Sequence, residues 1–503
     1  MIPNLAFTRR PWRRKPPLRP ASALAVLVVA LLGVLPLGCD KAPSDADATA
    51  KPPTATTSTA DRSDFLLGGI QVNEHDLDGW FDALERAGMN TVSVTDYARH
   101  GDWDDSLLMS EPNPGLLTEI RTAKERDFNV VLILRLALDH ADYFPRNRFF
   151  WHGMIMPNSV EQRRLWFTHY SAFVRSWAEI AAREGVDALM IGSELNAMAS
   201  TVPITAIPGL EAWYLDRDKQ AERRADFLAN ADTLAEPSWL RGRDDEDFAT
   251  YLDTRIAWER DWALTMTEGY DPALDQEARE AAYPDLSAGE QAAIAAINER
   301  RAEIERGWRD LIRCVREIYP GRIGYAANFD QYHEVGFWDD LDVIGINAYF
   351  QLRHHLLPPA DRAALGEALL SGWRRVLDDI DSTRQLLGAA DHPVIFTEMG
   401  FTFRANSTLE PWQSNGVSMF ETLDGDSELI VWQDQPVRFS ERAMAVHALH
   451  RADSERSNPL LDGILYWKLS TVPSHRDHEP FLVLLDDGPF EDPILEALRG
   501  FRH

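Results

Sequence analysis

Two apolar runs decide how this chain folds: Asp187-Ala-Leu-Met-Ile-Gly-Ser-Glu194 and Pro393-Val-Ile-Phe-Thr-Glu398. Each run is short and apolar throughout, which is typical of a parallel strand that is buried on both faces. Each run ends in a glutamate, and an ionised carboxylate is unfavourable inside a core. We therefore expect Glu194 and Glu398 to lie where the two strands open to solvent.

Further runs of the same kind give eight predicted strands, and helical periodicity fills most of the gaps between them. Strands that alternate with helices predict a parallel sheet. Eight such units in succession favour an α/β fold of the (β/α)8 TIM-barrel type over an open doubly wound sheet. No Gly-x-Gly-x-x-Gly follows the first strand, which disfavours a dinucleotide-binding fold. The predicted strands are Phe65–Val72, Thr91–Thr95, Asn129–Leu136, Asp187–Ser193, Arg322–Ala327, Asp342–Asn347, Pro393–Thr397 and Gly463–Trp467, and the clearest helices are Leu77–Ala87, Gly115–Arg126, Trp166–Glu184 and Trp308–Tyr319.

The first 38 residues resemble a bacterial lipoprotein signal peptide. Six Arg and Lys residues precede the apolar stretch from Ala21 to Leu37, and Gly38 and Cys39 follow it. Cys39 is the expected lipidation site, and an uncleaved anchor or a plain secretory peptide are the alternatives. Residues 39–63 are rich in Ala, Thr, Pro and Asp, which predicts a disordered tether. We therefore expect a protein of the cell envelope, lipid-anchored on the periplasmic or extracellular face of a membrane.

Residues 64–503 form the predicted barrel domain, and residues 199–300 form a long charged insertion after its fourth strand. Helical stretches are expected at Asp247–Thr265 and Ala288–Arg306. Because loops after barrel strands lie on the catalytic face, the insertion either walls part of a cleft or decorates its rim.

The formal net charge of −29 bears on the partners of the protein. Such a surface repels nucleic acid and anionic membranes. We expect no nucleic-acid partner, and contact with a membrane only through the N-terminal lipid. A neutral oligosaccharide or polysaccharide suits this charge better than a polyanion.

The motifs at the strand ends resemble those of clan A retaining glycoside hydrolases, most closely the β-mannanases of glycoside hydrolase family 113. The resemblance spans about Leu66 to Leu469 and lies in the order of the motifs, each at its own strand end. It implies an acid–base glutamate after strand four and a nucleophile after strand seven, which map onto Glu194 and Glu398. Departures occur around the sugar subsites, where a Lys-Pro-His-like run is replaced by Arg135-Leu136-Ala137 and a Trp-Arg-Gly pattern by Trp151-His152-Gly153. The motifs are Trp151-His-Gly-Met-Ile, Ile191-Gly-Ser-Glu-Leu195, Tyr325-Ala-Ala-Asn328, the run Phe337 to Tyr349, Phe396-Thr-Glu-Met-Gly-Phe401 and Tyr466-Trp467.

Hydrolysis with retention needs two carboxyl groups about 5–5.5 Å apart, one protonated and one ionised. We expect Glu194 to be the general acid–base and Glu398 to be the nucleophile. The charge of Glu398 is expected to raise the pKa of Glu194 and keep it protonated. The alternative is that both glutamates are ion-pair partners at the rim of the barrel.

The candidate substrate-binding residues are Trp151, His152, Arg135, Asn328, Tyr349 and Trp467. Indole rings stack on sugar faces, although an isolated tryptophan more often lies in a core. Tyr349 is expected either to hydrogen-bond the nucleophile or to pack at the rim. Arg135 needs a carboxylate partner, from the catalytic pair or from a neighbouring strand. Asn328 either binds a sugar hydroxyl or forms a turn.

We expect no cofactor and no catalytic metal. The loop His475-Arg-Asp-His478-Glu479 lacks the spacing of a helical zinc motif, and His354-His355 is equally unconvincing. The predicted function is hydrolysis of a β-linked glycan, with β-mannan implied by the resemblance. The alternative from another class is a catalytically silent glycan-binding lipoprotein on the same barrel.

Overall fold

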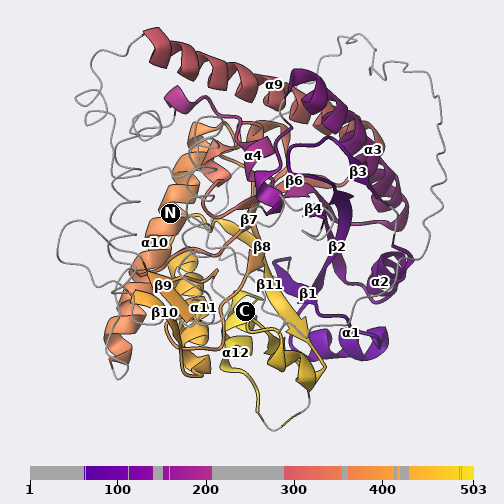
Figure 1. Ribbon diagram of the computed structural model, residues 1–503. Helices are drawn as coiled ribbons and strands as arrows, with labels where there is room; N and C mark the ends of the chain where they lie inside the picture. Colours follow the sequence, from indigo (N-terminus) through magenta and orange to yellow (C-terminus); the bar gives the residue numbers. More distant parts are fainter. Residues whose placement is uncertain are drawn as a thin grey trace, which may run out of the picture. The chain divides into compact units, whose positions relative to one another are not determined.

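Eight parallel strands close into a barrel in the computed structural model (Figure 1). Neighbouring strands follow the order β1-β11-β8-β7-β6-β5-β4-β2, and β1 pairs with β2 to close the ring. The expected (β/α)8 fold is confirmed, and each predicted strand has a counterpart in the barrel. The strands are β1 (Leu66–Gln71), β2 (Thr91–His100), β4 (Asn129–Leu138), β5 (Ala188–Ser193), β6 (Arg322–Asn328), β7 (Val343–Asn347), β8 (Val394–Met399) and β11 (Leu461–Ser470).

All described residues belong to one compact unit. The predicted signal peptide, Cys39, nearly all of the tether, the stretch Asp247–Thr265 and the pair His354-His355 lie outside them, so these remain predictions. No helix within the described part of the chain is long and apolar enough to span a bilayer. The structure describes residues 62, 64–110, 113–139, 151–157, 159–206, 288–353, 361–412, 416–419, 430–486, 488 and 490–502.

The interior of the barrel is a small apolar cluster formed by alternate residues of the strands. On β4 the cluster takes Val131 and Ile133, whereas Val130, Leu132 and Leu134 pack outward in the larger cluster with the helices. This alternation follows from the two-residue period of a strand. The same parity brings polar or aromatic side chains into the barrel at the carboxyl ends of four strands. These residues are Arg135 of β4, Asn328 of β6, Asn347 of β7 and Trp467 of β11.

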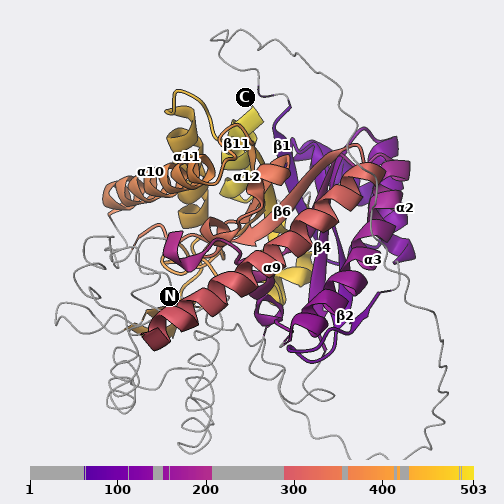
Figure 2. The same cartoon turned by 90° about the horizontal axis from the view of Figure 1, so that it is seen from above.

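Helices cover the outside of the barrel, and α9 runs alongside α3 in both ribbon views (Figures 1 and 2). Residues 288–300 of the predicted insertion are the first part of α9, which is continuous with the helix predicted at Trp308–Tyr319. Gly307 permits the close approach of α9 to α3, because a Cβ there would lie 2.4 Å from the ring of Phe167. The helices are α1 (Leu77–Arg86), α2 (Pro114–Glu125), α3 (Val160–Glu184), α4 (Asn196–Ala199), α9 (Ala288–Ile318), α10 (Arg362–Leu386), α11 (Phe439–Ser454) and α12 (Pro493–Arg499).

Short strands and 3-10 turns complete the described elements. The two-residue strand β3 (Leu108–Met109) pairs with β2, and β12 (Val483–Leu484) pairs with β11. Strand β9 (Gly416–Met419) pairs with β10 (Ile430–Asp434) outside the barrel. Short 3-10 turns include η2 (His152–Met154), η5 (Trp338–Asp340), η6 (Pro473–Asp477) and η7 (Gly500–Arg502).

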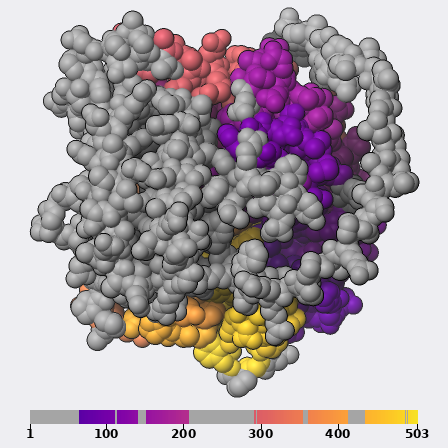
Figure 3. Space-filling model, viewed as in Figure 1, coloured from indigo at the N-terminus to yellow at the C-terminus, as the bar shows by residue number. Residues whose placement is uncertain are grey.

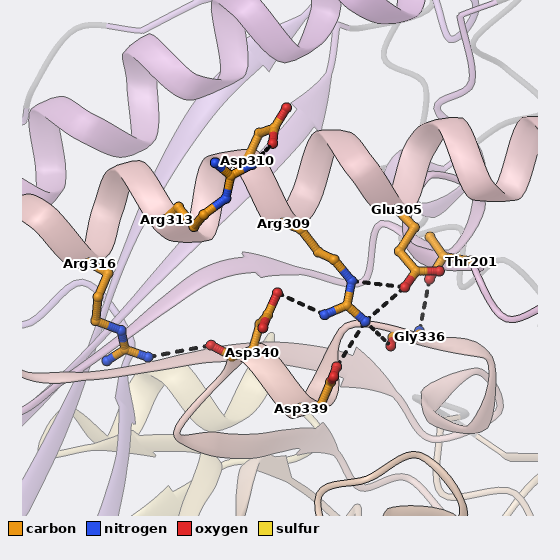
Figure 4. A network of polar contacts seen from close by, with 9 residues as sticks. All are labelled: Thr201, Glu305, Arg309, Asp310, Arg313, Arg316, Gly336, Asp339 and Asp340. Carbon is orange, nitrogen blue, oxygen red and sulfur yellow. Dashed lines mark hydrogen bonds and ion pairs between the residues drawn. The ribbon is translucent and has the colours of Figure 1, made fainter. Parts of the chain in front are cut away.

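An arginine on α9 joins this helix to the connection between β6 and β7 (Figure 4). The guanidinium of Arg309 contacts Asp339 at 2.9 Å and Asp340 at 2.7 Å, both on η5, and also Glu305 one turn back on α9. It donates a further hydrogen bond to the carbonyl of Gly336 at 3.0 Å. These carboxylates raise the pKa of Arg309 further, although partial burial opposes the shift. The network fixes the loop that precedes β7.

The first and last strands of the barrel, β1 and β11, pair with each other. Indigo and yellow parts of the chain adjoin on the face shown in the space-filling view (Figure 3). The ring of Phe501 on η7 stacks on Phe65 just before β1, with 5.2 Å between centroids. Arg502 donates to the carbonyl of Gly88 at 2.7 Å, and Arg62 pairs with Asp453 of α11 at 2.6 Å. The C-terminal segment therefore fastens the start of the barrel domain.

Candidate active site

Glu194 follows β5 directly and lies at the mouth of the barrel. Its backbone takes a left-handed conformation with φ of 52°, and its amide donates to the carbonyl of Ala326 at the end of β6 at 2.9 Å. Oε1 accepts a hydrogen bond from Asn347 Nδ2 at 2.9 Å, and Oε2 lies 3.1 Å from Nε2 of His152. The side chain is 14% exposed, so it is held firmly but remains open to the mouth of the barrel.

Glu398 lies within β8, and its side chain is only 4% exposed. Between β7 and β8, Ile346 pairs with Phe396 and the next residue of β7, Asn347, pairs with Glu398. Thr397 is therefore an extra residue in β8. Such a bulge re-aims the side chain that follows it. Tyr349 donates to Oε2 of Glu398 at 2.6 Å, as expected, and Arg135 forms an ion pair with Oε1.

The two carboxylates lie at the same end of one barrel. The strands that carry them are parallel, and Asn347 connects the two sites because it pairs with Glu398 along β8 and hydrogen-bonds Glu194. The guanidinium of Arg135 pairs with Glu398, and its charge also acts on Glu194. An arrangement with the two glutamates at opposite ends of the fold is thereby excluded.

The expected rise in the pKa of Glu194 is wrong. Burial raises the pKa of the Glu194 carboxyl, but other groups outweigh it and bring the pKa to about 2. These groups are His152, which gives a hydrogen bond and a charge, Arg135, which gives a charge, and Asn347, which gives a hydrogen bond. The sequence indicates the charge of Glu398, but it does not show that His152 and Arg135 act on Glu194.

The candidate aromatic residues lie around these carboxylates. Trp467 is half-buried, and its ring lies 5.5 Å from the Arg135 guanidinium carbon and 4.5 Å from Nζ of Lys468. Trp151 is also half-buried and packs against the core, with its ring edge-to-face on His152 at 4.9 Å. Asn328 is buried, and its Oδ1 accepts from the amide of Phe329 at 3.0 Å, which is the contact expected of a turn-forming residue.

Residues 292–424 match the model of Glycoside Hydrolase Family 113. With the closed barrel, this match identifies the chain as a glycoside hydrolase and confirms the resemblance found in the motifs. The matched segment runs from α9 past β8, so it includes Tyr349 and Glu398, whereas Glu194, His152 and Trp467 lie outside it.

Two solved structures of family 113 proteins resemble the chain. One is a complex of a β-1,4-mannanase, with a TM-score of 0.47 and 16% identity, covering 87% of this chain and 98% of that chain. The other is the β-mannanase AaManA from Alicyclobacillus acidocaldarius in complex with ManMIm, with a TM-score of 0.48 and 16% identity, covering 87% of this chain and 96% of that chain. No curated protein sequence matches the chain.

Asn347 is the site residue of this glycoside hydrolase to which the sequence argument gave no role. It is fully buried, and Nδ2 also lies 3.2 Å from Oγ of Ser193, while Oδ1 accepts from Thr397 Oγ1 at 2.8 Å. A buried amide with partners on both sides fixes the orientation of the groups that it bonds. The available signal was an asparagine that ends the apolar run Val343-Ile-Gly-Ile.

No cluster of three or more metal-ligating side chains occurs in the part of the chain that the structure describes. His475 belongs to η6, and its Nδ1 lies 2.8 Å from Oγ of Ser470 at the end of β11. This histidine therefore supports the loop after β11 through a hydroxyl.

Proposed function

We propose that this glycoside hydrolase cleaves β-linked glycans with retention of configuration, and that β-mannan is the first substrate to test. The observation that carries the proposal is the convergence of Glu194 and Glu398 at one barrel mouth, joined through Asn347. Two carboxyl groups on one sugar site are the machinery of double displacement. Their different surroundings assign each of them a role.

Glu398 acts as the nucleophile. Arg135 pairs with one of its oxygens and Tyr349 donates to the other, so both partners favour the ionised carboxylate and fix its orientation. An ionised carboxylate that is held in this way can attack the anomeric carbon while the leaving oxygen departs. The product of this first step is a glycosyl ester of Glu398.

Glu194 acts on protons in both steps. It delivers a proton to the leaving oxygen, and then accepts one from the water that attacks the ester. Its carboxylate is 14% exposed, whereas that of Glu398 is 4% exposed, which suits a group that must meet the leaving sugar and then water.

Two features favour a neutral glycan as substrate. Trp467 and Trp151 are half-buried beside the carboxylates, and indole faces stack on the C–H faces of sugars. The net charge of −29 opposes binding of a polyanion. The choice of β-mannan follows from the family match, and a panel of β-linked polysaccharides tests it.

The roles are tested with the variants Glu398→Ala and Glu194→Ala and with azide as an external nucleophile. We expect Glu398→Ala to lower turnover by roughly 1,000-fold or more, and azide to restore it as an α-glycosyl azide by direct displacement. With Glu194→Ala, azide should instead intercept the glycosyl-enzyme and give a β-glycosyl azide. Glu303→Gln is the control, because this carboxylate pairs with Arg163 at 2.7 Å on the helical layer.

Unchanged turnover in either alanine variant would reject the assignment. Calorimetry with oligosaccharides, run beside a reducing-sugar assay on the wild-type protein, tests the alternative function. Heat of binding without new reducing ends would identify a catalytically silent glycan-binding protein.

A further inference from the structure

The imidazole of His152 is the group that meets the carboxylate assigned to proton transfer. We propose that His152 and Glu194 share one proton and that this pair, rather than Glu194 alone, is the general acid of the reaction. The inference rests on the proposed function, because it takes Glu194 as the acid–base residue. It adds a second titratable residue to the catalytic step.

The position of His152 is built into the fold. It begins the 3-10 turn η2, and its Nε2 lies 3.1 Å from Oε2 of Glu194. The rings of Trp151 and His152 pack edge-to-face, and Trp151 itself packs against the core. A Cβ at Gly153 would lie 2.4 Å from Trp151 and 2.8 Å from the carbonyl oxygen of Glu194, so only glycine lets this turn sit against the Glu194 backbone.

A paired proton resolves a conflict in the site. With its present partners Glu194 is ionised, because its pKa is about 2 when burial is set against His152, Arg135 and Asn347. An ionised carboxylate cannot donate a proton. The hydrogen bond to His152 holds a proton next to Oε2, and moving it along that bond gives a protonated Glu194 without a proton from solvent.

The proton balance of both steps follows from one shared proton. In the first step the bond from the anomeric carbon to the leaving oxygen breaks, and a bond to a Glu398 oxygen forms. The leaving oxygen keeps the electron pair and takes the proton from Oε2, so Glu194 is left ionised and His152 neutral. In the second step water attacks the anomeric carbon and releases Glu398, and its proton passes to the pair and restores it.

The groups around the pair come from β4, from helix α4 and from two tyrosines. Arg135 is the ionisable residue of β4, and a guanidinium does not exchange its proton near neutral pH, whereas an imidazole can. Helix α4, which packs on η2, holds no ionisable residue. Burial raises the pKa of Tyr349 and of Tyr325 well above 10, so both stay neutral.

Two carboxyl groups also face the pair. Glu398 stays in its ion pair with Arg135. Burial and the charges of Glu194 and Glu334 raise the pKa of Asp330 to about 6, so Asp330 is the competing source of a pH effect. The variant Asp330→Asn removes that source.

The test is the pH profile of kcat/KM for His152→Gln, measured on the polysaccharide that the panel selects. The amide keeps a donor to Glu194 but cannot titrate, so loss of the shared proton no longer sets the alkaline limb. We expect this limb to move to lower pH by about one unit or more. His169→Gln is the matched control, because His169 is also half-buried and bonds the carbonyl of Ser106 at 2.8 Å.

A second measurement separates proton donation from a structural role. A 2,4-dinitrophenyl glycoside leaves without a proton, so His152→Gln should change its hydrolysis far less than that of the polysaccharide. If the variant melts below the wild-type protein, His152→Asn takes its place in both assays.

Three outcomes would overturn the inference. They are an alkaline limb at the wild-type pH in His152→Gln, equal losses with both leaving groups, and a limb that moves only in Asp330→Asn. If one of these outcomes occurs while Glu194→Ala is impaired and rescued by azide, the shared proton is rejected and the proposed function stands. If Glu194→Ala keeps full turnover, the proposed function itself fails.

Discussion

Arg135 and Tyr349 hold the two oxygens of the same carboxylate by different means. The guanidinium of Arg135 brings a charge, whereas Tyr349 brings a neutral donor at 2.6 Å, and burial keeps that phenol neutral. A hydrogen bond to a charged group is worth about 1.5–3 kcal/mol, so each partner alone can orient Glu398. The tyrosine is the cleaner of the two to test, because its removal leaves the charge of the site unchanged.

Tyr349→Phe should therefore lower kcat by roughly 10- to 100-fold, as expected for loss of one charge-assisted hydrogen bond. The phenyl ring keeps the packing on Phe481, whose centroid lies 6.1 Å away. Tyr319→Phe is the control, because Tyr319 is buried and donates to Val186 at 2.8 Å before β5, at the other end of the barrel. Equal kcat in wild type and Tyr349→Phe would show that Arg135 alone positions the nucleophile.

The residues of the site were predictable where a strand carries them. Glu194, Glu398 and Tyr349 each follow or end an apolar run, and strand parity directs Arg135 inward. The contact of His152 with Glu194 could not be predicted, because it depends on how a turn between β4 and α3 folds back over the barrel. The wrong expectation for the pKa of Glu194 has the same origin, since the positive groups beside it come from other elements.

At the scale of elements, all eight barrel strands were predictable because burial on both faces makes them continuous apolar runs. The bulge in β8 was not predictable, because the strand has only six residues and one extra residue does not visibly change the pattern of apolar residues. Helix α9 was predicted as two separate helices, because Gly307 between them disfavours a continuous helix. In the structure this glycine lies directly against the ring of Phe167 on α3.

Helix α2 carries a buried carboxyl that links it to the barrel. Glu119 is 4% exposed, and its Oε2 accepts from Gln71 of β1 at 3.0 Å. Burial raises its pKa from an ordinary value of 4.5 to about 7, and the charge of Glu74 adds to the shift. The folded protein thus binds more protons than the unfolded chain between these values, so Glu119 destabilises the fold as pH rises from 4.5 through 7.

Glu119→Gln should remove this pH dependence, because the amide can still accept the bond from Gln71. Relative to wild type, we expect the variant to be more stable at pH 8 by roughly 2–3 kcal/mol and to differ little at pH 4. Thermal melts at the two pH values measure this. Glu125→Gln, an exposed position on the same helix, should show no such change. A gain of equal size at both pH values would contradict the argument.

At the scale of the whole molecule, contacts that stabilise the closed barrel lie at the opposite end from the residues proposed for catalysis. The residues proposed for catalysis lie at the carboxyl ends of the strands, whereas the clasp formed by Phe501, Phe65 and Arg502 lies where β1 begins. The pairing of β1 with both β2 and β11 closes the barrel, and the contacts of the C-terminal segment lie at the start of β1. The clasp consists of an aromatic stack and side chains that bond the backbone.

Phe501→Ala should weaken this clasp without touching the site. The ring is fully buried, and truncation of such a phenylalanine costs about 3–5 kcal/mol. We expect a clear fall in Tm, measured by calorimetry, with unchanged kcat at a temperature where the variant is still folded. Phe490→Ala is the matched control, because its ring is 48% exposed and its loss should cost about 1 kcal/mol or less. A fall in kcat that exceeds the fall in folded protein would show that the clasp reaches the catalytic end of the barrel, against the separation argued above.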